Sequence, residues 1–189
     1  IMKSQHQNVV FVFTKVGALL AIDVETGKVV WGLRTKIESL TSHVSAPTVT
    51  SDVTSVNCKE TVMVGGVHAV NACSGKRIWY ESIPATKYSD PTVTTIAKIP
   101  IVFTNGKDSK IYAQFAGNGT VIYSKKLIGT KLTKPVVVSS ILITATSPDL
   151  KSLGTKSNPM KKVGFVYALN AFNGDIIWSW TPKPSTATA

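Results

Sequence analysis

The sequence is poor in acidic residues, cysteine and histidine, and it has no long apolar run. It lacks the roughly 18 consecutive apolar residues of a membrane-spanning helix, so no membrane span is predicted. The histidines, His6, His43 and His68, share no metal-ligand spacing with one another or with the two cysteines. Phosphate-binding glycine loops, nucleophile elbows and paired-carboxylate patterns are missing as well. The sequence therefore predicts no metal ion, no cofactor and no catalytic residue.

The charge that is present is mostly positive: 21 basic residues stand against 10 acidic ones in 189 residues. Residues 106–162 concentrate this excess, with ten lysines against two aspartates. This stretch could attract an anionic partner, or it could be a solvated surface. Nucleic acid is not favoured, because this stretch has no arginine. The candidate basic patch is Lys125, Lys126, Lys131, Lys151, Lys156, Lys161 and Lys162.

A segment of eleven residues occurs four times, at 21–31, 69–79, 113–123 and 168–178. Each copy has an alanine, a glycine six residues later and an aromatic residue four residues after the glycine. The aromatic residues are 48, 44 and 55 residues apart. Four matches in one register indicate a structural repeat.

Strand-forming sequences surround each copy. Apolar, β-branched runs precede the copies, at 9–13, 61–64, 99–103 and 136–143, and a further strand is expected near each of Pro47, Pro91 and Pro135. No amphipathic helix is evident. The sequence predicts an all-β fold in which each repeat is a sheet of four antiparallel strands, as in a β-propeller blade.

The intact motif in Ala21–Trp31 resembles the tryptophan-docking repeat of the PQQ-like (quinoprotein-type) β-propellers. This family includes quinoprotein alcohol dehydrogenases, a β-barrel assembly lipoprotein of bacterial outer membranes and luminal domains of secretory-pathway proteins. The resemblance implies that the aromatic residue of one blade stacks on the glycine turn of its neighbour. The implied blade-docking residues are Trp31, Trp79, Tyr123, Trp178, Gly27, Gly75, Gly119 and Gly174.

The repeats fill about four blades, whereas the resemblance implies seven or eight in a closed ring. We expect a propeller segment over residues 1–181, with a blade remnant at 8–34, blades at 47–83, 91–127 and 135–180, and a linker or disordered tail at 182–189. Two open blade faces would be an aggregation hazard. The missing blades are expected either in another chain or in sequence that is not part of this one, and an unusually small ring is the alternative. A fragment or half-propeller completed by a partner or second chain is the favoured interpretation.

Two further features bear on the cellular compartment. A two-residue turn at Gly65-Gly66 would place Cys58 opposite Cys73, within reach of a disulfide, although both could be buried thiols. A disulfide would indicate an oxidising compartment. Asn118 begins the one standard glycosylation triplet, which is also simply a good turn sequence. An extracytoplasmic location, whether secreted, luminal or periplasmic, follows as an expectation.

The predicted function is a non-catalytic scaffold for protein–protein interaction. In a propeller the innermost strands line the channel, where Asp90 and Lys134 are candidates for a binding site at its mouth. A loop at 147–162 extends the last repeat and could carry function. The alternatives are a fragment of a PQQ-dependent dehydrogenase and a basic module that binds an anionic surface.

Overall fold

Four antiparallel sheets make up the protein. The computed structural model describes residues 8–35, 46–50, 60–65, 68–80, 90–106, 108–148 and 164–182. Blade 1 consists of β1 (Val9–Phe13), β2 (Ala18–Asp23) and β3 (Val29–Arg34). Blade 2 consists of β4 (Thr48–Thr50), β5 (Thr61–Val64), β6 (His68–Asn71) and β7 (Arg77–Tyr80).

The other two sheets follow in the same order. Blade 3 consists of β8 (Thr92–Ile96), β9 (Ile99–Asn105), β10 (Lys110–Phe115) and β11 (Val121–Lys126). Blade 4 consists of β12 (Thr130–Leu132), β13 (Val136–Val138), β14 (Ile141–Ser147), β15 (Val166–Asn170) and β16 (Ile176–Trp180), with β12 and β13 both paired to β14. Apart from this double pairing, each strand pairs with the strands that precede and follow it within its own blade. The predicted all-β propeller fold is confirmed.

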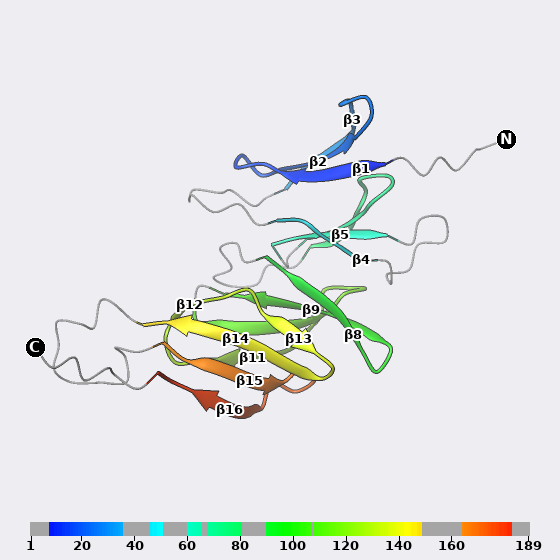
Figure 1. Cartoon of the computed structure of the whole chain (residues 1–189). Coiled ribbons are helices and arrows are strands. Elements are labelled where there is room, and N and C mark those ends of the chain that lie inside the picture. Colours follow the sequence, from blue (N-terminus) through cyan, green and yellow to red (C-terminus); the bar gives the residue numbers. More distant parts are fainter. Residues whose placement is uncertain are drawn as a thin grey trace, which may run out of the picture.

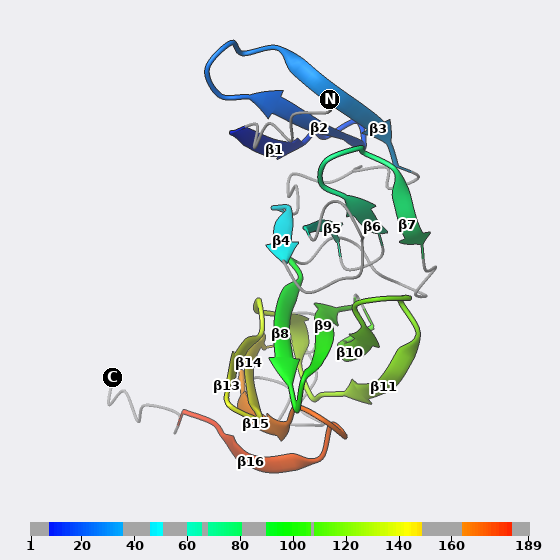
Figure 2. The same ribbon diagram turned by 90° about the vertical axis from the view of Figure 1, so that its right-hand side faces the viewer.

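The sheets are stacked face to face into an array (Figure 1). Apolar side chains fill the spaces between neighbouring sheets, because each strand turns alternate residues toward each of its two faces. Phe13 and Leu19 of blade 1 belong to one buried cluster with Val62 and Val64 of blade 2. Figure 2 shows β4 and β8 following one another along one side of the array, and β8 also contacts β13. These are the expected inner strands.

The strand pairing corrects two details of the sequence prediction. Thr61 pairs with Asn71 and Val64 with His68, so residues 65–67 separate β5 from β6. This register differs by one residue from that of a two-residue turn at Gly65-Gly66, and Cys58, whose place opposite Cys73 was predicted from such a turn, lies outside the described residues. The apolar run at 136–143 is not one strand, because Ser139 takes a left-handed φ of 57° in a turn that separates β13 from β14.

Within the described ranges, the structure contains no helix with the length and apolar character that a membrane crossing requires. The predicted tail lies outside the described residues from position 183 on. The same holds for most of the predicted loop in the last repeat, at 149–162.

Candidate functional site

An aromatic ring from each of the first three blades lies on a glycine of the next blade. The indole of Trp31 covers Gly75 so closely that a Cβ built on the glycine would stand 2.6 Å from Cδ2 of the ring. The Trp31 Nε1–H donates a hydrogen bond of 2.9 Å to the carbonyl of Ala72, three residues before the glycine. Glycine is required at this turn for two reasons, its φ of +69° and the ring above it.

The same contact is made twice more along the array. Trp79 covers Gly119 and donates to the carbonyl of Ala116 over 2.7 Å. Tyr123 covers Gly174, and its hydroxyl donates to the carbonyl of Ala171 over 3.1 Å. Burial raises the pKa of the Tyr123 hydroxyl, which therefore stays protonated as the donor. We call this repeated arrangement the ring-on-glycine contact.

Trp178, the fourth aromatic residue of the repeat, covers no glycine of the described chain. Its side chain is 46% exposed, whereas Trp79 at the equivalent position in blade 2 is 8% exposed. Trp180 lies two residues further along β16 and is 58% exposed. Strand pairing links Trp180 to Val166 and Trp178 to Ala168, so both indoles lie on the side of blade 4 that faces away from blade 3.

The rest of that side is also apolar. Ala168 pairs with Ile143, Ile143 with Val136, and Ile141 with Val138, which places these side chains on the same face of the sheet as Trp178. We define the C-terminal face by its exposed large side chains, which are Val136, Val138, Ile141, Trp178 and Trp180. An apolar surface extending over four strands is typical of a surface that another protein element covers.

The opposite end of the array carries the other half of the contact. Gly27 has the same left-handed φ, +66°, as the three covered glycines, yet nothing lies within 4 Å of a Cβ built on it. The carbonyl three residues before it belongs to Val24 instead of an alanine. The ring-on-glycine contact is thus left open at both ends, with an aromatic ring at one and a glycine turn at the other.

The sheet face beside Gly27 is apolar too. Val10 pairs with Ile22 and Val12 with Leu20, on the side of blade 1 that faces away from blade 2. The equivalent residues of blade 2 include Val62, Val64 and Val70, which are completely buried under blade 1. We define the N-terminal face as Val10, Val12, Leu20, Ile22 and Val29.

Hydrogen bonds between blades also link the inner strands. The Thr48 hydroxyl donates to the carbonyl of Pro91 over 2.9 Å, and the Thr92 hydroxyl donates to the carbonyl of Pro135 over 2.6 Å. These bonds were not predicted from the sequence, although the repeated Pro-Thr-Val at 47–49 and 91–93 was their signal. In blade 4 the equivalent residue is Val136, which has no hydroxyl to donate.

The two candidates at the channel mouth differ in their surroundings. The half-buried Asp90 accepts a hydrogen bond of 2.7 Å from the backbone N–H of Ala46, and thereby joins blade 3 to the segment that enters blade 2. Lys134 is exposed. Within the part of the chain that the structure describes, no contact joins the two side chains, and their role in binding stays a prediction.

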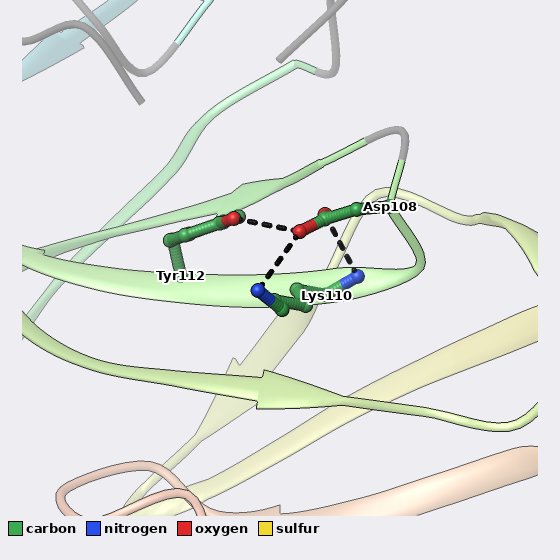
Figure 3. Close-up of polar contacts among 3 residues, drawn as sticks. All are labelled: Asp108, Lys110 and Tyr112. Atoms are coloured by element: carbon green, nitrogen blue, oxygen red, sulfur yellow. Dashed lines mark hydrogen bonds and ion pairs between the residues drawn. The ribbon is translucent and has the colours of Figure 1, made fainter. Parts of the chain in front are cut away.

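A polar cluster at the β9–β10 turn joins Asp108, Lys110 and Tyr112 (Figure 3). The Tyr112 hydroxyl donates to Asp108 Oδ2 over 2.9 Å, and Lys110 Nζ lies 3.2 Å from the same oxygen. Burial acts to raise the pKa of Asp108, but the hydrogen bonds from Tyr112 and Lys110 outweigh it and lower that pKa. Burial and the carboxylate raise the pKa of Tyr112 to about 12. The cluster anchors a tyrosine ring in the core, because Tyr112 packs in the cluster of Phe13 and Val64.

His68 lies on β6, fully buried on the face toward blade 1, at the position that Leu20 takes in blade 1. Its ring is 4.6 Å from the ring of Tyr80, and neither nitrogen has a hydrogen-bond partner. Burial, with a smaller contribution from Arg77, lowers the pKa of His68 to about 4. The residue is a neutral part of the core near neutral pH.

The remaining predicted site residues lie at the surface or outside the described ranges. Asn118 is exposed in the turn that Trp79 covers, where its Oδ1 accepts the N–H of Thr120. Cys73 lies in the turn after β6, and Cys58 lies outside the described residues, so their pairing stays a prediction. Lys126 and Lys131 are exposed and Lys125 is half-buried, whereas Lys151, Lys156, Lys161 and Lys162 lie outside the described part of the chain.

Four of the described acidic side chains, those of Asp23, Asp90, Asp108 and Asp175, accept hydrogen bonds within turns or between blades. Asp23 accepts hydrogen bonds from Thr26, which lower its pKa, and Asp175 accepts one from Asn173. Across the described ranges, no group of three or more His, Cys, Asp or Glu side chains is arranged to hold a metal ion. Their arrangement gives no carboxylate set for a calcium ion such as a quinoprotein would need.

Comparison with known proteins identifies the class to which this array belongs. A sequence model of the family described as outer membrane protein assembly factor BamB, a PQQ-like repeat family, matches residues 4–180. The chain belongs to this family of β-propellers. No curated protein matches it.

Solved structures show the same fold at low sequence identity. BamB from Moraxella catarrhalis is 19% identical with a TM-score of 0.51, and the match covers 93% of this chain and 62% of that one. The quinohemoprotein alcohol dehydrogenase ADHIIG from Pseudomonas putida HK5 is 14% identical with a TM-score of 0.66, over 94% of this chain and 33% of that one. The enzyme from Comamonas testosteroni is 16% identical with a TM-score of 0.61, over 93% and 34%. The chain thus spans less than two thirds of the length of these proteins.

Proposed function

We propose that the chain is a non-catalytic β-propeller scaffold that binds other polypeptide through its two end faces. The observation that carries the proposal is the exposed Trp178, which presents half of a contact that three other aromatic residues complete within the chain. An exposed indole within an apolar sheet face is the kind of residue that dominates binding energy in protein interfaces. Membership of a family described by an assembly factor supports the same function.

The proposed setting is extracytoplasmic, as the family description of an outer membrane assembly factor suggests. A Cys58–Cys73 disulfide and a glycan on Asn118 belong to this proposal as features of such a compartment. In the same proposal, Asp90 and Lys134 at the channel mouth and the basic patch are secondary contacts of the scaffold.

The proposal is tested on the protein isolated from its source under native conditions and weighed by mass spectrometry. We expect a mass well above the 20.2 kDa of the chain. The double variant Trp178→Ala, Trp180→Ala should return to that mass. Phe172→Ser is the matched control, because Phe172 is an aromatic residue of the same blade, 45% exposed, in the turn before β16. A wild-type mass of 20.2 kDa, or a complex that survives the double variant, would contradict the proposal.

The second candidate is a segment of a quinoprotein dehydrogenase, favoured by the TM-scores of the two alcohol dehydrogenases. The described aspartates argue against this function, because Asp23, Asp90, Asp108 and Asp175 are occupied by hydrogen bonds within turns and between blades. The two functions are separated by adding pyrroloquinoline quinone, Ca²⁺, an alcohol and a redox dye to the native complex. A scaffold leaves the dye oxidised, and steady reduction of the dye would establish the dehydrogenase.

A further inference from the structure

The connection from β11 to β12 presents an exposed isoleucine between lysines. Ile128 is 52% exposed, although it directly follows the buried Leu127. Lys125 and Lys126 precede it at the end of β11, and Lys131 follows it on β12. We call Lys125, Lys126, Ile128 and Lys131 the lysine–isoleucine tip. A single exposed apolar side chain is ordinary, but this one is held in place and is surrounded by charge of one sign.

Side chains of blade 4 fix the backbone of Ile128. The Tyr167 hydroxyl accepts the Ile128 N–H over 3.2 Å and donates to its carbonyl over 3.3 Å. The Thr146 hydroxyl donates to the same carbonyl over 2.9 Å. Because the protein itself satisfies both polar backbone groups, this residue can enter an apolar medium without losing backbone hydrogen bonds to water.

The tip belongs to the interior of the array and to neither end face. Leu127 and Tyr167 lie in the buried cluster that fills the space between blades 3 and 4, together with Phe103 of blade 3 and Leu142 of blade 4. The neighbours that hold the tip are therefore all within the described chain, and its exposure does not depend on what covers the ends of the array.

The surroundings of the tip are positively charged. Residues 109–148 contain five lysines and no acidic residue. Lys110 lies opposite Lys126 in the β10–β11 pair, but its Nζ is 3.2 Å from Asp108 Oδ2, which offsets its charge. Within the described residues, no carboxylate is paired with the other four. These uncompensated charges, which attract an anionic surface, are Lys125, Lys126, Lys131 and Lys134.

We propose that the lysine–isoleucine tip binds the surface of an anionic lipid bilayer. Ile128 enters the boundary between headgroups and acyl chains, and the lysines contact the headgroup phosphates. Basic residues beside an exposed apolar side chain are typical of proteins that lie on a membrane. An acidic polypeptide would account for the lysines, but it gives no role to an exposed isoleucine whose backbone is already satisfied.

This proposal names a partner for the described lysines of the basic patch. It does not depend on the C-terminal or N-terminal face, so it and the scaffold function can fail separately.

The experiment is co-sedimentation of the purified full chain with vesicles of phosphatidylcholine, with and without phosphatidylglycerol. We expect binding to the vesicles that contain the anionic lipid and little binding to phosphatidylcholine alone. Added salt should weaken the binding, because it screens the attraction between the lysines and the headgroups. A chain that does not bind the anionic vesicles at low salt would overturn the proposal.

A double lysine variant tests the location of the contact. Lys126→Gln with Lys131→Gln should weaken vesicle binding about twenty-five-fold, since each lysine near an anionic surface contributes about fivefold. The matched control is Lys28→Gln with Lys76→Gln. It removes the same charge from two exposed lysines that precede β3 and β7, at the opposite end of the outer strands from Lys126. The control should weaken binding far less, and equal losses would overturn the assignment to the tip.

Ile128→Ser tests the apolar part of the contact. It should weaken vesicle binding about fivefold, as loss of a partly buried aliphatic side chain does. Phe172→Ser is the control, because Phe172 is 45% exposed and lies in a stretch, 164–182, that contains no lysine. Trp178→Ala, which tests the scaffold function, should also leave vesicle binding unchanged.

The variants also separate a bilayer from an acidic polypeptide. Binding that Ile128→Ser leaves unchanged would overturn the bilayer as partner, and displacement of the vesicles by soluble polyglutamate would then identify an acidic polypeptide in its place. Vesicle binding that depends on Trp178 instead of Ile128 would overturn the tip. None of these outcomes changes the dependence of the native complex on Trp178, which decides the scaffold function.

Discussion

Single side chains determine how neighbouring sheets of this protein meet. A flat ring lies on a residue that has no side chain, and its polar edge bonds a carbonyl that the turn leaves available. The geometry is the same for Trp31, Trp79 and Tyr123, with a Cβ-to-ring distance of 2.6 Å at each glycine. Tyrosine can replace tryptophan because its hydroxyl reaches the equivalent carbonyl.

Replacing a covered glycine by alanine should destabilise the protein more than replacing an open one. Gly119→Ala introduces a left-handed alanine and pushes a methyl group into Trp79, whereas Gly27→Ala introduces the same backbone strain with nothing nearby. We expect the strain to cost about 1–2 kcal/mol in both, and the collision to add about 1–3 kcal/mol in Gly119→Ala alone. Urea unfolding measures the loss of stability in each variant, made in a Trp178→Ala background so that neither end face is engaged. Equal losses in Gly119→Ala and Gly27→Ala would show that the collision with the Trp79 ring costs nothing.

His68 makes stability depend on pH. Its pKa is about 4 in the folded protein and 6.5 without perturbation, so the unfolded chain takes up the proton first as the pH falls. Stability should therefore decrease from about pH 6.5 down to about pH 4, with a slope of up to about 1.4 kcal/mol per pH unit.

The control for this prediction is His68→Leu, which copies the residue at the equivalent position of blade 1. Urea unfolding of both proteins between pH 4 and pH 7 gives the two slopes. The leucine variant should lose the part of the slope that His68 contributes. Identical slopes in both proteins would assign the pH dependence to other groups.

At the scale of strands, the sequence predicted the outer part of each blade well. The eleven-residue motif predicted the strand–turn–strand units that end at Trp31, Trp79, Tyr123 and Trp178, because short-range turn chemistry and alternation dominate there. The three inner strands were also predicted in the right places, near Pro47, Pro91 and Pro135, but the bonds that hold them to other blades were not predicted. The run at 136–143 hid a turn, because serine is an ordinary residue whose left-handed φ at Ser139 has no local signal.

The candidate site, like the strands, could be predicted only in part from the sequence. The aromatic and glycine positions followed from the repeat, whereas the exposure of Trp178 follows from the end of the stack and has no local signature. The register error at Gly65 arose because two adjacent glycines signal a turn without fixing which residues of the flanking strands pair. The Asp108–Lys110–Tyr112 cluster was missed, because its two charged members looked like part of a lysine-rich surface.

The threonine bonds between inner strands should contribute measurably to stability. Thr92→Val removes the hydroxyl that donates to the carbonyl of Pro135 and keeps the shape of the side chain. We expect a loss of about 1 kcal/mol in the free energy of unfolding. Thr94→Val on the same strand is the control, and chemical denaturation compares the two. If both variants lose the same stability, the bond between blades 3 and 4 has no net effect.

For the whole molecule, the four sheets form an array with two unlike, apolar ends. The residues that define the two ends carry no charge, although the chain as a whole has a formal net charge of +11. The internal interfaces show what covers such a face, namely another blade that presents the complementary half of the ring-on-glycine contact. The end faces are thus the part of the molecule on which the proposed function depends.

The most direct test of this account is hydroxyl-radical footprinting of the tryptophans by mass spectrometry, on the dilute chain and on the assembled protein. In the dilute chain Trp178 should be oxidised readily and Trp79 should be protected, as their exposures of 46% and 8% require. In the assembly the oxidation of Trp178 should fall toward that of Trp79. A Trp178 that is oxidised equally in both samples would contradict the claim that the end faces are docking surfaces.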